Sequence, residues 1–215
     1  MALVLHYHPL SSFCWKVLIP LYEKGLPFER VMIDFANSDS TDAFRSLWPM
    51  AKMPVLVDEE GGVTLPESSI IIEYLEMRFG GEPALFPADS GAALEVRLRD
   101  RFLDLFVHHP MQKIVGDRIR PADRRDAYGV EEARETLRKA YRLLEGRFAP
   151  FPWAAGEAFG LADCAAAPAL HYADKVEPFG DAHPILSDYL ERLRARPSFA
   201  RVLEEAEPFA HFFPE

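Results

Sequence analysis

Three side chains that carry a hydroxyl or a thiol stand close together near the start of the chain. Ser11, Ser12 and Cys14 follow a short strand-like run and open a segment with helical spacing. The first N–H groups of a helix lack partners within the helix and carry partial positive charge, so a thiolate placed against them is stabilised. A serine hydroxyl at the same place adds a hydrogen bond, and both effects favour ionisation of a bound thiol near neutral pH. Serine is also a common N-cap, so on this segment alone simple helix capping is the more economical interpretation.

Two later segments carry groups that suit the backbone and the ends of a small peptide. Lys52-Met53-Pro54 leads into an apolar run, where a proline is ordinary by itself. In Pro66-Glu67-Ser68-Ser69, Glu67 can accept a hydrogen bond from an α-amino group, and Ser68 can donate to an α-carboxylate. Ser68 can equally be no more than the N-cap of the following helix.

The elements that must position these segments are predicted from apolar spacing and turn residues. Strand-like runs cover 3–7, 28–34, 54–58 and 63–65, and helical patterns cover 12–24, 41–47 and 68–79. Two strands joined through a helix predict a parallel βαβ unit. The last two strands flank a turn that contains Gly61 and Gly62, which is typical of a hairpin.

Beyond a stretch rich in glycine and proline, the pattern becomes helical only. Apolar residues recur at helical spacing in several segments, and Ala162 to Ala173 is small and apolar all round, which predicts a buried central helix. We therefore predict an α/β domain over residues 1–80, a linker over 81–92 and an all-α domain over 93–215.

Composition narrows the classes of partner. A net charge of −10 and a pI near 5.2 disfavour a nucleic-acid partner, which needs a basic surface. The two cysteines form no CxxC or zinc pattern, so we expect no metal and a reducing cytoplasm. The start lacks a signal-peptide pattern, and no apolar run approaches the roughly 20 residues that span a bilayer, so no membrane partner is expected.

In the order and spacing of its motifs, the chain resembles the glutathione S-transferases over nearly its whole length. The resemblance is to the cytosolic type and is closest to the serine-type theta and zeta classes and their bacterial relatives. It rests on Ser-Ser-Phe-Cys-Trp-Lys-Val at 11–17, Lys-Met-Pro-Val-Leu at 52–56, Pro-Glu-Ser-Ser-Ile-Ile-Ile-Glu-Tyr-Leu at 66–75 and Leu-Ala-Asp-Cys at 161–164. This resemblance implies that the α/β domain is thioredoxin-like and that the second domain is a helical bundle.

The resemblance also implies a role for each matched residue. Ser11 would hold the glutathione thiolate, with Ser12 and Cys14 as alternates. Pro54 would be a cis-proline that turns the Met53 backbone toward the cysteinyl part of glutathione. Glu67 and Ser68 would grip its γ-glutamyl end, Lys52 would lie near its glycine carboxylate, and Asp163 would cap the buried helix.

The second substrate would occupy a neighbouring pocket in the same fold. The residues that we expect to line it are Phe13, His108, Met111 and Gln112. These side chains suit a small, apolar electrophile, as in detoxification, with glutathione as the co-substrate. Members of the family usually form homodimers, so we expect one here.

Two other functions are compatible with the same sequence features. One is a binding or scaffold protein on the same fold, without turnover, since a fold does not determine function. The other is a thiol–disulfide or lyase-type enzyme that uses Cys14 as its nucleophile.

Overall fold

The first part of the chain alternates strands and helices as its apolar spacing predicts. The computed structural model describes residues 3–148 and 151–214, so the remaining residues of the predicted domain ranges lie outside it. The elements are β1 (Leu3–Tyr7), α1 (Ser12–Glu23), β2 (Glu29–Met32), α2 (Ser38–Leu47), β3 (Val55–Asp58), β4 (Val63–Pro66) and α3 (Ser68–Phe79).

These strands form one mixed sheet in the order β2-β1-β3-β4. β1 pairs with β2 in parallel, with Leu5 opposite Arg30, and pairs with β3 antiparallel, with Leu5 opposite Leu56. β3 and β4 pair antiparallel as a hairpin. The parallel βαβ unit and the hairpin that the sequence predicts are both confirmed.

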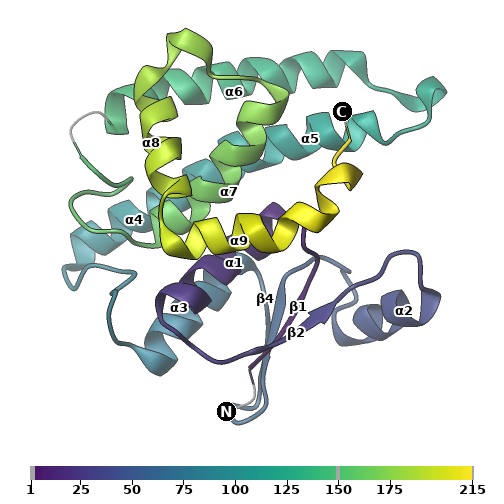
Figure 1. Ribbon diagram of the computed structural model, residues 1–215, viewed down its shortest axis with the longest axis vertical. Coiled ribbons are helices and arrows are strands. Elements are labelled where there is room, and N and C mark those ends of the chain that lie inside the picture. The colour runs from purple at the N-terminus through teal and green to yellow at the C-terminus, as the bar shows by residue number, and fades with distance from the viewer. Residues whose placement is uncertain (1–2, 149–150, 215) are drawn as a thin grey trace.

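Helices cover both faces of the sheet. α1 and α3 lie together on one face, where apolar side chains of β1 and β3 join the main core. α2 lies on the other face, where Phe44 packs in a small separate cluster with Ile33 and Val55. In Figure 1, α2 stands to one side of the sheet, while α1 lies between the sheet and the helices above.

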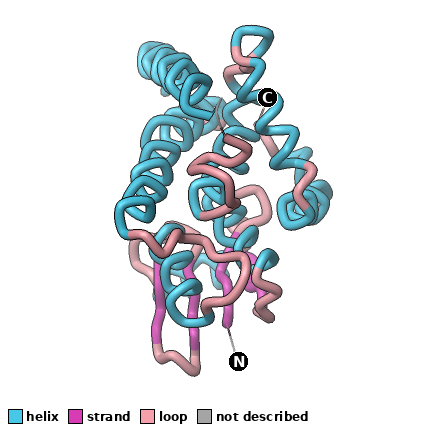
Figure 2. The backbone as a smooth tube through the Cα atoms, turned by 90° about the vertical axis from the view of Figure 1, so that its left-hand side faces the viewer, coloured by secondary structure: helices cyan, strands magenta, loops and turns pink. Residues whose placement is uncertain are grey.

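From Ser90 onward the described residues form helices joined by loops, and their β-structure is limited to an isolated bridge between Trp153 and Gly156. The elements are α4 (Ser90–Leu103), the π-helical turn η1 (Asp104–His108), α5 (His109–Arg118), η2 (Ala122–Arg124), α6 (Ala127–Phe148), α7 (Leu161–Val176), η3 (Gly180–Ala182), α8 (Pro184–Arg194), α9 (Pro197–Ala206) and η4 (Glu207–Phe212). Figure 2 shows the strands gathered at the lower end of the molecule with helices beside them, and only helices and loops at the other end. The fold is therefore an α/β thioredoxin-like part followed by an all-α part.

Helix α7 forms the centre of the helical part, as its small apolar side chains predict. Asp163 in its first turn is fully buried and accepts hydrogen bonds from the N–H groups of Gly160 (2.9 Å) and Ala154 (2.8 Å) and from the Tyr189 hydroxyl (2.5 Å). α1 packs against α7 and α9, so the core is continuous between the two parts.

Two helices begin earlier than their apolar spacing predicts, because polar caps define their first turns. Asn37 accepts from the N–H groups of Asp39 and Ser40, so α2 begins at Ser38. Asp89 accepts from Ala92 N–H at 2.8 Å, so α4 begins at Ser90, inside the segment predicted as a linker. Length and apolarity together fall short of a membrane span in every helix of the described ranges.

Candidate functional site

Ser11 stands where β1 turns into α1. Its backbone is extended (φ −78°, ψ 116°), and its hydroxyl accepts a hydrogen bond from Cys14 N–H at 3.3 Å, which makes it the N-cap of α1. The loop before it is held from two sides, since Trp15 Nε1 donates to Pro9 O (2.6 Å) and the Tyr172 hydroxyl donates to Leu10 O (3.1 Å). The Ser11 hydroxyl is an acceptor in its contact with Cys14, and its own O–H can be donated to a ligand.

The second segment precedes β3. The Met53–Pro54 peptide bond is cis, as the resemblance implies. Pro54 is buried and Met53 half-buried, whereas Lys52 is exposed, with its ammonium group available to an anion.

The third segment connects β4 to α3. Glu67 is the N-cap residue of α3 by position, yet its side chain makes no capping hydrogen bond, and its backbone has φ 71° and ψ 109°. A non-glycine residue in this region is held there by its surroundings, and such residues concentrate at binding sites. Ser68 begins α3 and is 6% exposed. The sequence is compatible with Ser68 as the N-cap of α3. In the structure, Glu67 occupies the N-cap position and Ser68 is the first residue of the helix.

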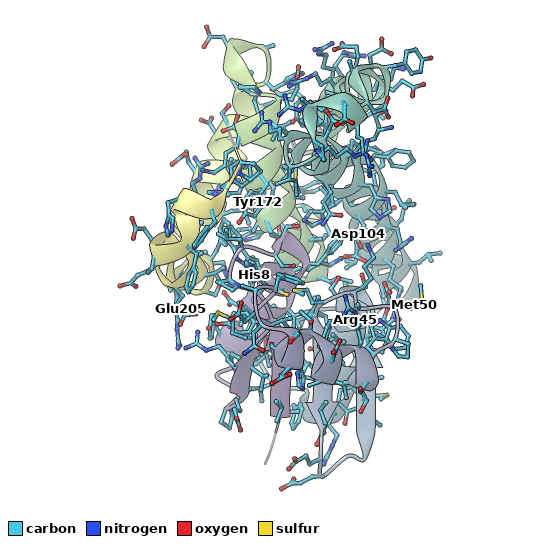
Figure 3. The ribbon with its side chains drawn as sticks, turned by 90° about the vertical axis from the view of Figure 1, so that its right-hand side faces the viewer. His8, Arg45, Met50, Asp104, Tyr172 and Glu205 are labelled. Atoms are coloured by element: carbon cyan, nitrogen blue, oxygen red, sulfur yellow. The ribbon has the colours of Figure 1, made fainter. Side chains whose placement is uncertain are left out.

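The three segments meet in one cavity of about 690 Å³, a volume within the usual range for small-molecule sites. Apart from the alternate Cys14, every residue predicted to contact glutathione lines this cavity, and so do three of the four predicted for the second substrate: Ser11, Ser12, Lys52, Met53, Pro54, Glu67, Ser68, Phe13, Met111 and Gln112. Figure 3 looks toward this side of the molecule, where His8, Asp104 and Tyr172 lie at the level at which the sheet part meets the helices.

His108 is the exception, and its placement in the pocket is wrong. Its side chain is completely buried, with its ring 4.4 Å from the ring of Phe13 and its Nδ1 3.3 Å from Asp104. The turn that contains it is π-helical, with the N–H of His109 bonded to the carbonyl of Asp104. This wider turn brings Leu105 and His109 to the cavity in place of His108.

Cys14 lies in the core rather than in the cavity. It is fully buried, and burial raises the pKa of its thiol to about 12, although hydrogen bonds to Ser11 and to the His8 backbone oppose that shift. A thiol with this pKa is protonated at neutral pH, so the geometry disfavours Cys14 as a nucleophile.

A buried ion cluster lies directly behind the cavity. The Lys16 ammonium contacts Asp100 (2.6 Å), Asp104 (2.8 Å) and the Ser69 hydroxyl (3.0 Å). Burial raises the pKa of Asp100. Burial acts in the same direction on Asp104, but the hydrogen bond with His108 and the charge of Lys16 outweigh it and lower the pKa of Asp104 to about 2. Because Asp104 also lines the cavity, the cluster joins α1 and α3 to the wall that η1 supplies.

Sequence reasoning missed Lys16, although two signals were present. Lys16 is the only charged residue in the run from Phe13 to Leu21, and Asp100 and Asp104 stand four residues apart on one face of a helix. The apolar walls from Phe35, Tyr172 and Phe213 were also missed, because no local motif marks these residues. In the described ranges, no group of three or more histidine, cysteine, aspartate or glutamate side chains is placed to hold a metal ion.

Family models and known proteins match this chain over most of its length. The sequence matches the family description "Glutathione S-transferase, N-terminal domain" over residues 5–83 and "Glutathione S-transferase, C-terminal domain" over residues 127–192. It is 30% identical to a glutathione S-transferase of Pseudomonas putida over 226 residues, which cover 99% of this chain and 96% of that protein.

Two further relatives differ in the function that their names indicate. A crystal structure of a glutathione S-transferase from Methylobacterium radiotolerans, in complex with glutathione sulfonate, superposes with a TM-score of 0.80 at 29% identity and covers 94% of each chain. A stringent starvation protein A homolog of Haemophilus influenzae is 28% identical over 200 residues, covering 91% of this chain and 87% of that protein.

Proposed function

Because this chain belongs to the glutathione S-transferase family, we propose that it ionises the thiol of glutathione beside Ser11 and joins the sulfur to a small apolar electrophile. Full-length similarity to glutathione S-transferases supports the transferase activity and glutathione as the substrate. The role of Ser11 and the class of electrophile are the parts that this proposal adds.

Three segments around the cavity bind glutathione in this proposal. Glu67 accepts hydrogen bonds from the γ-glutamyl ammonium, and Ser68, at the positively polarised start of α3, donates to the α-carboxylate. The N–H and C=O of Met53 pair with the cysteinyl residue as an added strand would. The exposed ammonium of Lys52 attracts the glycine carboxylate.

These contacts direct the thiol toward the start of α1. The Ser11 hydroxyl donates to the sulfur, and the helix N-terminus favours negative charge there, so both lower the pKa of the bound thiol from its usual value of about 8.5. A decrease of two units corresponds to roughly 2.7 kcal/mol. The thiol proton leaves to water, the thiolate forms a C–S bond with the electrophilic carbon, and the leaving group departs with the bonding electron pair.

The observation that carries the proposal is the convergence of Ser11, Met53 and Glu67 on one cavity at the N-terminus of α1. The test is calorimetric titration with glutathione near pH 7, combined with ultraviolet detection of the thiolate, on the wild type, Ser11→Ala and the matched variant Ser12→Ala. We expect both variants to bind glutathione and only Ser11→Ala to lose the thiolate signal. Loss in Ser12→Ala alone would move the role to Ser12, and absence of wild-type binding at millimolar glutathione would remove the proposal.

A second candidate is a binding or scaffold protein without turnover. The similarity to a stringent starvation protein A homolog favours it, because that relative, unlike the others described above, is not named as a transferase. The same calorimetric titration separates the two, since only the transferase requires glutathione in the cavity.

We also propose a homodimer in the cytoplasm. Large apolar side chains on α3 and α4 stand in water: Ile70 is 51% exposed, Met77 79%, Leu94 67% and Leu98 56%. Several such residues on adjacent helices are typical of a surface that a partner covers. Because members of the family usually form homodimers, we propose that this partner is a second copy of the chain.

A further inference from the structure

His8 lies on the turn that leads from β1 into α1, and its ring lines the same cavity as Ser11. Its backbone C=O accepts a hydrogen bond from Ser11 N–H at 3.0 Å, so these two residues form the ends of one tight turn. Figure 3 shows His8 above the strands and below Tyr172. The imidazole ring and the proposed thiolate site are therefore carried by the same short segment.

The contacts of His8 assign its proton to one of the two ring nitrogens. Nδ1 accepts a hydrogen bond from Leu10 N–H at 3.2 Å, and only an unprotonated nitrogen can accept. Burial of the ring lowers the pKa of His8, although the charge of Asp34 acts in the opposite direction. His8 is therefore neutral near pH 7, with its proton on Nε2.

The Nε2–H of His8 is available to a ligand. Within the described part of the chain no group accepts a hydrogen bond from it, and Nε2 is accessible, unlike Nε2 of His108, which the core encloses. The ring packs against Phe35, with centroids 5.5 Å apart, and Phe35 itself lines the cavity while 63% exposed. The hydroxyl of Tyr172, by contrast, already donates its proton to Leu10 O at 3.1 Å. His8 thus presents an unused donor close to Ser11.

We propose that His8 is a catalytic residue whose Nε2–H stabilises an oxygen of the electrophile that becomes negatively charged when the sulfur adds. The inference rests on the proposed function and narrows its electrophile to conjugated carbonyl compounds, whose oxygen takes up that charge. The hydrogen bond to Leu10 holds the ring in place before substrate arrives, so the donor needs no reorganisation as the charge develops.

The electrons move in this step without a leaving group. The thiolate forms a C–S bond with the β-carbon, the π electrons of the C=C bond shift toward the carbonyl, and the enolate oxygen accepts the hydrogen bond from Nε2–H. Water then gives a proton to the α-carbon, and the C=O bond forms again. This proton balances the one that the thiol released to water, and His8 keeps its own.

The test compares two electrophiles of equal chain length on the intact protein with saturating glutathione. Hexenal is a conjugated aldehyde, whereas iodohexane has no oxygen and loses iodide. In His8→Asn the side-chain carbonyl can still accept from Leu10 N–H, as asparagine does from the backbone two residues on, but no donor remains at the place of Nε2. We expect kcat/KM to fall about 100-fold with hexenal, the scale for loss of one donor to a developing oxyanion, and by less than about twofold with iodohexane.

His8→Gln is the complementary variant, because its amide NH2 group can reach the place of Nε2 while the acceptor for Leu10 is lost. It should keep kcat/KM with hexenal within about tenfold of the wild type. If His8 only holds the loop, the order is reversed, with the Asn variant active and the Gln variant impaired with both electrophiles. That order, or an equal fall with both electrophiles in His8→Asn, would overturn the proposal. The matched control is His183→Asn, at the N-cap position of α8 and outside the residues that line this cavity, which should change neither rate.

Two further measurements distinguish failure of this inference from failure of the proposed function. Nitrogen chemical shifts from NMR spectroscopy report the tautomer of His8 without glutathione. We expect Nε2–H at pH 7, and a protonated ring or an Nδ1–H tautomer overturns the inference whether or not glutathione binds. Calorimetric binding of glutathione should be unchanged in His8→Asn. A wild type that binds no glutathione and reacts with neither electrophile refutes the proposed function and this inference together. A wild type that reacts with both, while His8→Asn loses nothing, removes only the role of His8.

Discussion

At the scale of single residues, Ser11, Ser12 and Cys14 lie within four positions at the start of α1 but differ in whether their side chains reach the cavity. Ser11 caps the helix and lines the cavity, and Ser12 lines it while being only 4% exposed. Cys14 faces the core, because residues two positions apart on a helix, such as Ser12 and Cys14, point to different sides, and Ser11 precedes the helical backbone. The direction of each side chain, rather than its nucleophilicity, therefore decides which one can meet a ligand.

Replacement of Cys14 tests this division. Cys14→Ala should keep kcat/KM within about twofold, because the sulfur lies outside the cavity and its raised pKa keeps it protonated. It should lower the free energy of unfolding by roughly 1 kcal/mol, as loss of a small buried group does. Activity is measured with glutathione and chlorodinitrobenzene, and stability by urea denaturation. Loss of activity in a folded Cys14→Ala protein, or a mixed disulfide between Cys14 and glutathione, would favour the cysteine-dependent alternative.

At the scale of elements, buried ion pairs as well as apolar packing connect the α/β part and the helical part beneath the cavity. Lys16 comes from α1 and Ser69 from α3, whereas Asp100 and Asp104 come from α4 and η1. Their contacts place the starts of α1 and α3 against η1, and η1 and the start of α5 supply Leu105 and His109 to the wall of the cavity. Burial makes these contacts strong and also makes a missing partner costly.

Removal of the buried cation should therefore be strongly destabilising. Lys16→Met leaves two buried carboxylates without their cation, and we expect the free energy of unfolding to fall by about 3–5 kcal/mol. The matched control is Lys139→Met, because Lys139 is 67% exposed and lies 3.9 Å from Glu135 on the same helix. That change should cost less than about 0.5 kcal/mol. Urea denaturation followed by circular dichroism measures both, and equal stabilities of the two variants would contradict a structural role for Lys16.

At the scale of the whole molecule, the cavity lies between a sheet part and a helical part that share one apolar core. α1 contributes to both, since its first turn carries Ser11 and its length packs on α3, α7 and α9. The exposed apolar residues of α3 and α4 lie outside this core. This is the surface that the proposed dimer would cover.

Paired charge substitutions on this surface test the dimer. Met77→Glu with Leu98→Glu introduces two carboxylates where the proposed partner packs, so we expect the protein to change from a dimer to a monomer. Sedimentation velocity on the wild type and the double variant measures this change. Tyr128→Glu, at an equally exposed aromatic residue of α6, should leave the dimer intact. A wild type that sediments as a monomer would refute the dimer.

The sequence by itself determined the elements whose causes are local. Apolar spacing predicted the strands and helices, turn residues predicted the hairpin, and the small side chains of 162–173 predicted the buried α7. The tertiary structure alone decided which side chains face the cavity. The π-turn η1 turns His108 inward and brings His109 to the wall, and Lys16 is buried only because Asp100 and Asp104 approach from a distant helix. Phe213 reaches the cavity because residues 212–214 return to Arg118 and Tyr172. These contacts join segments that are far apart in the chain. They depend on how whole helices and strands pack, which the spacing of apolar residues within one segment does not indicate.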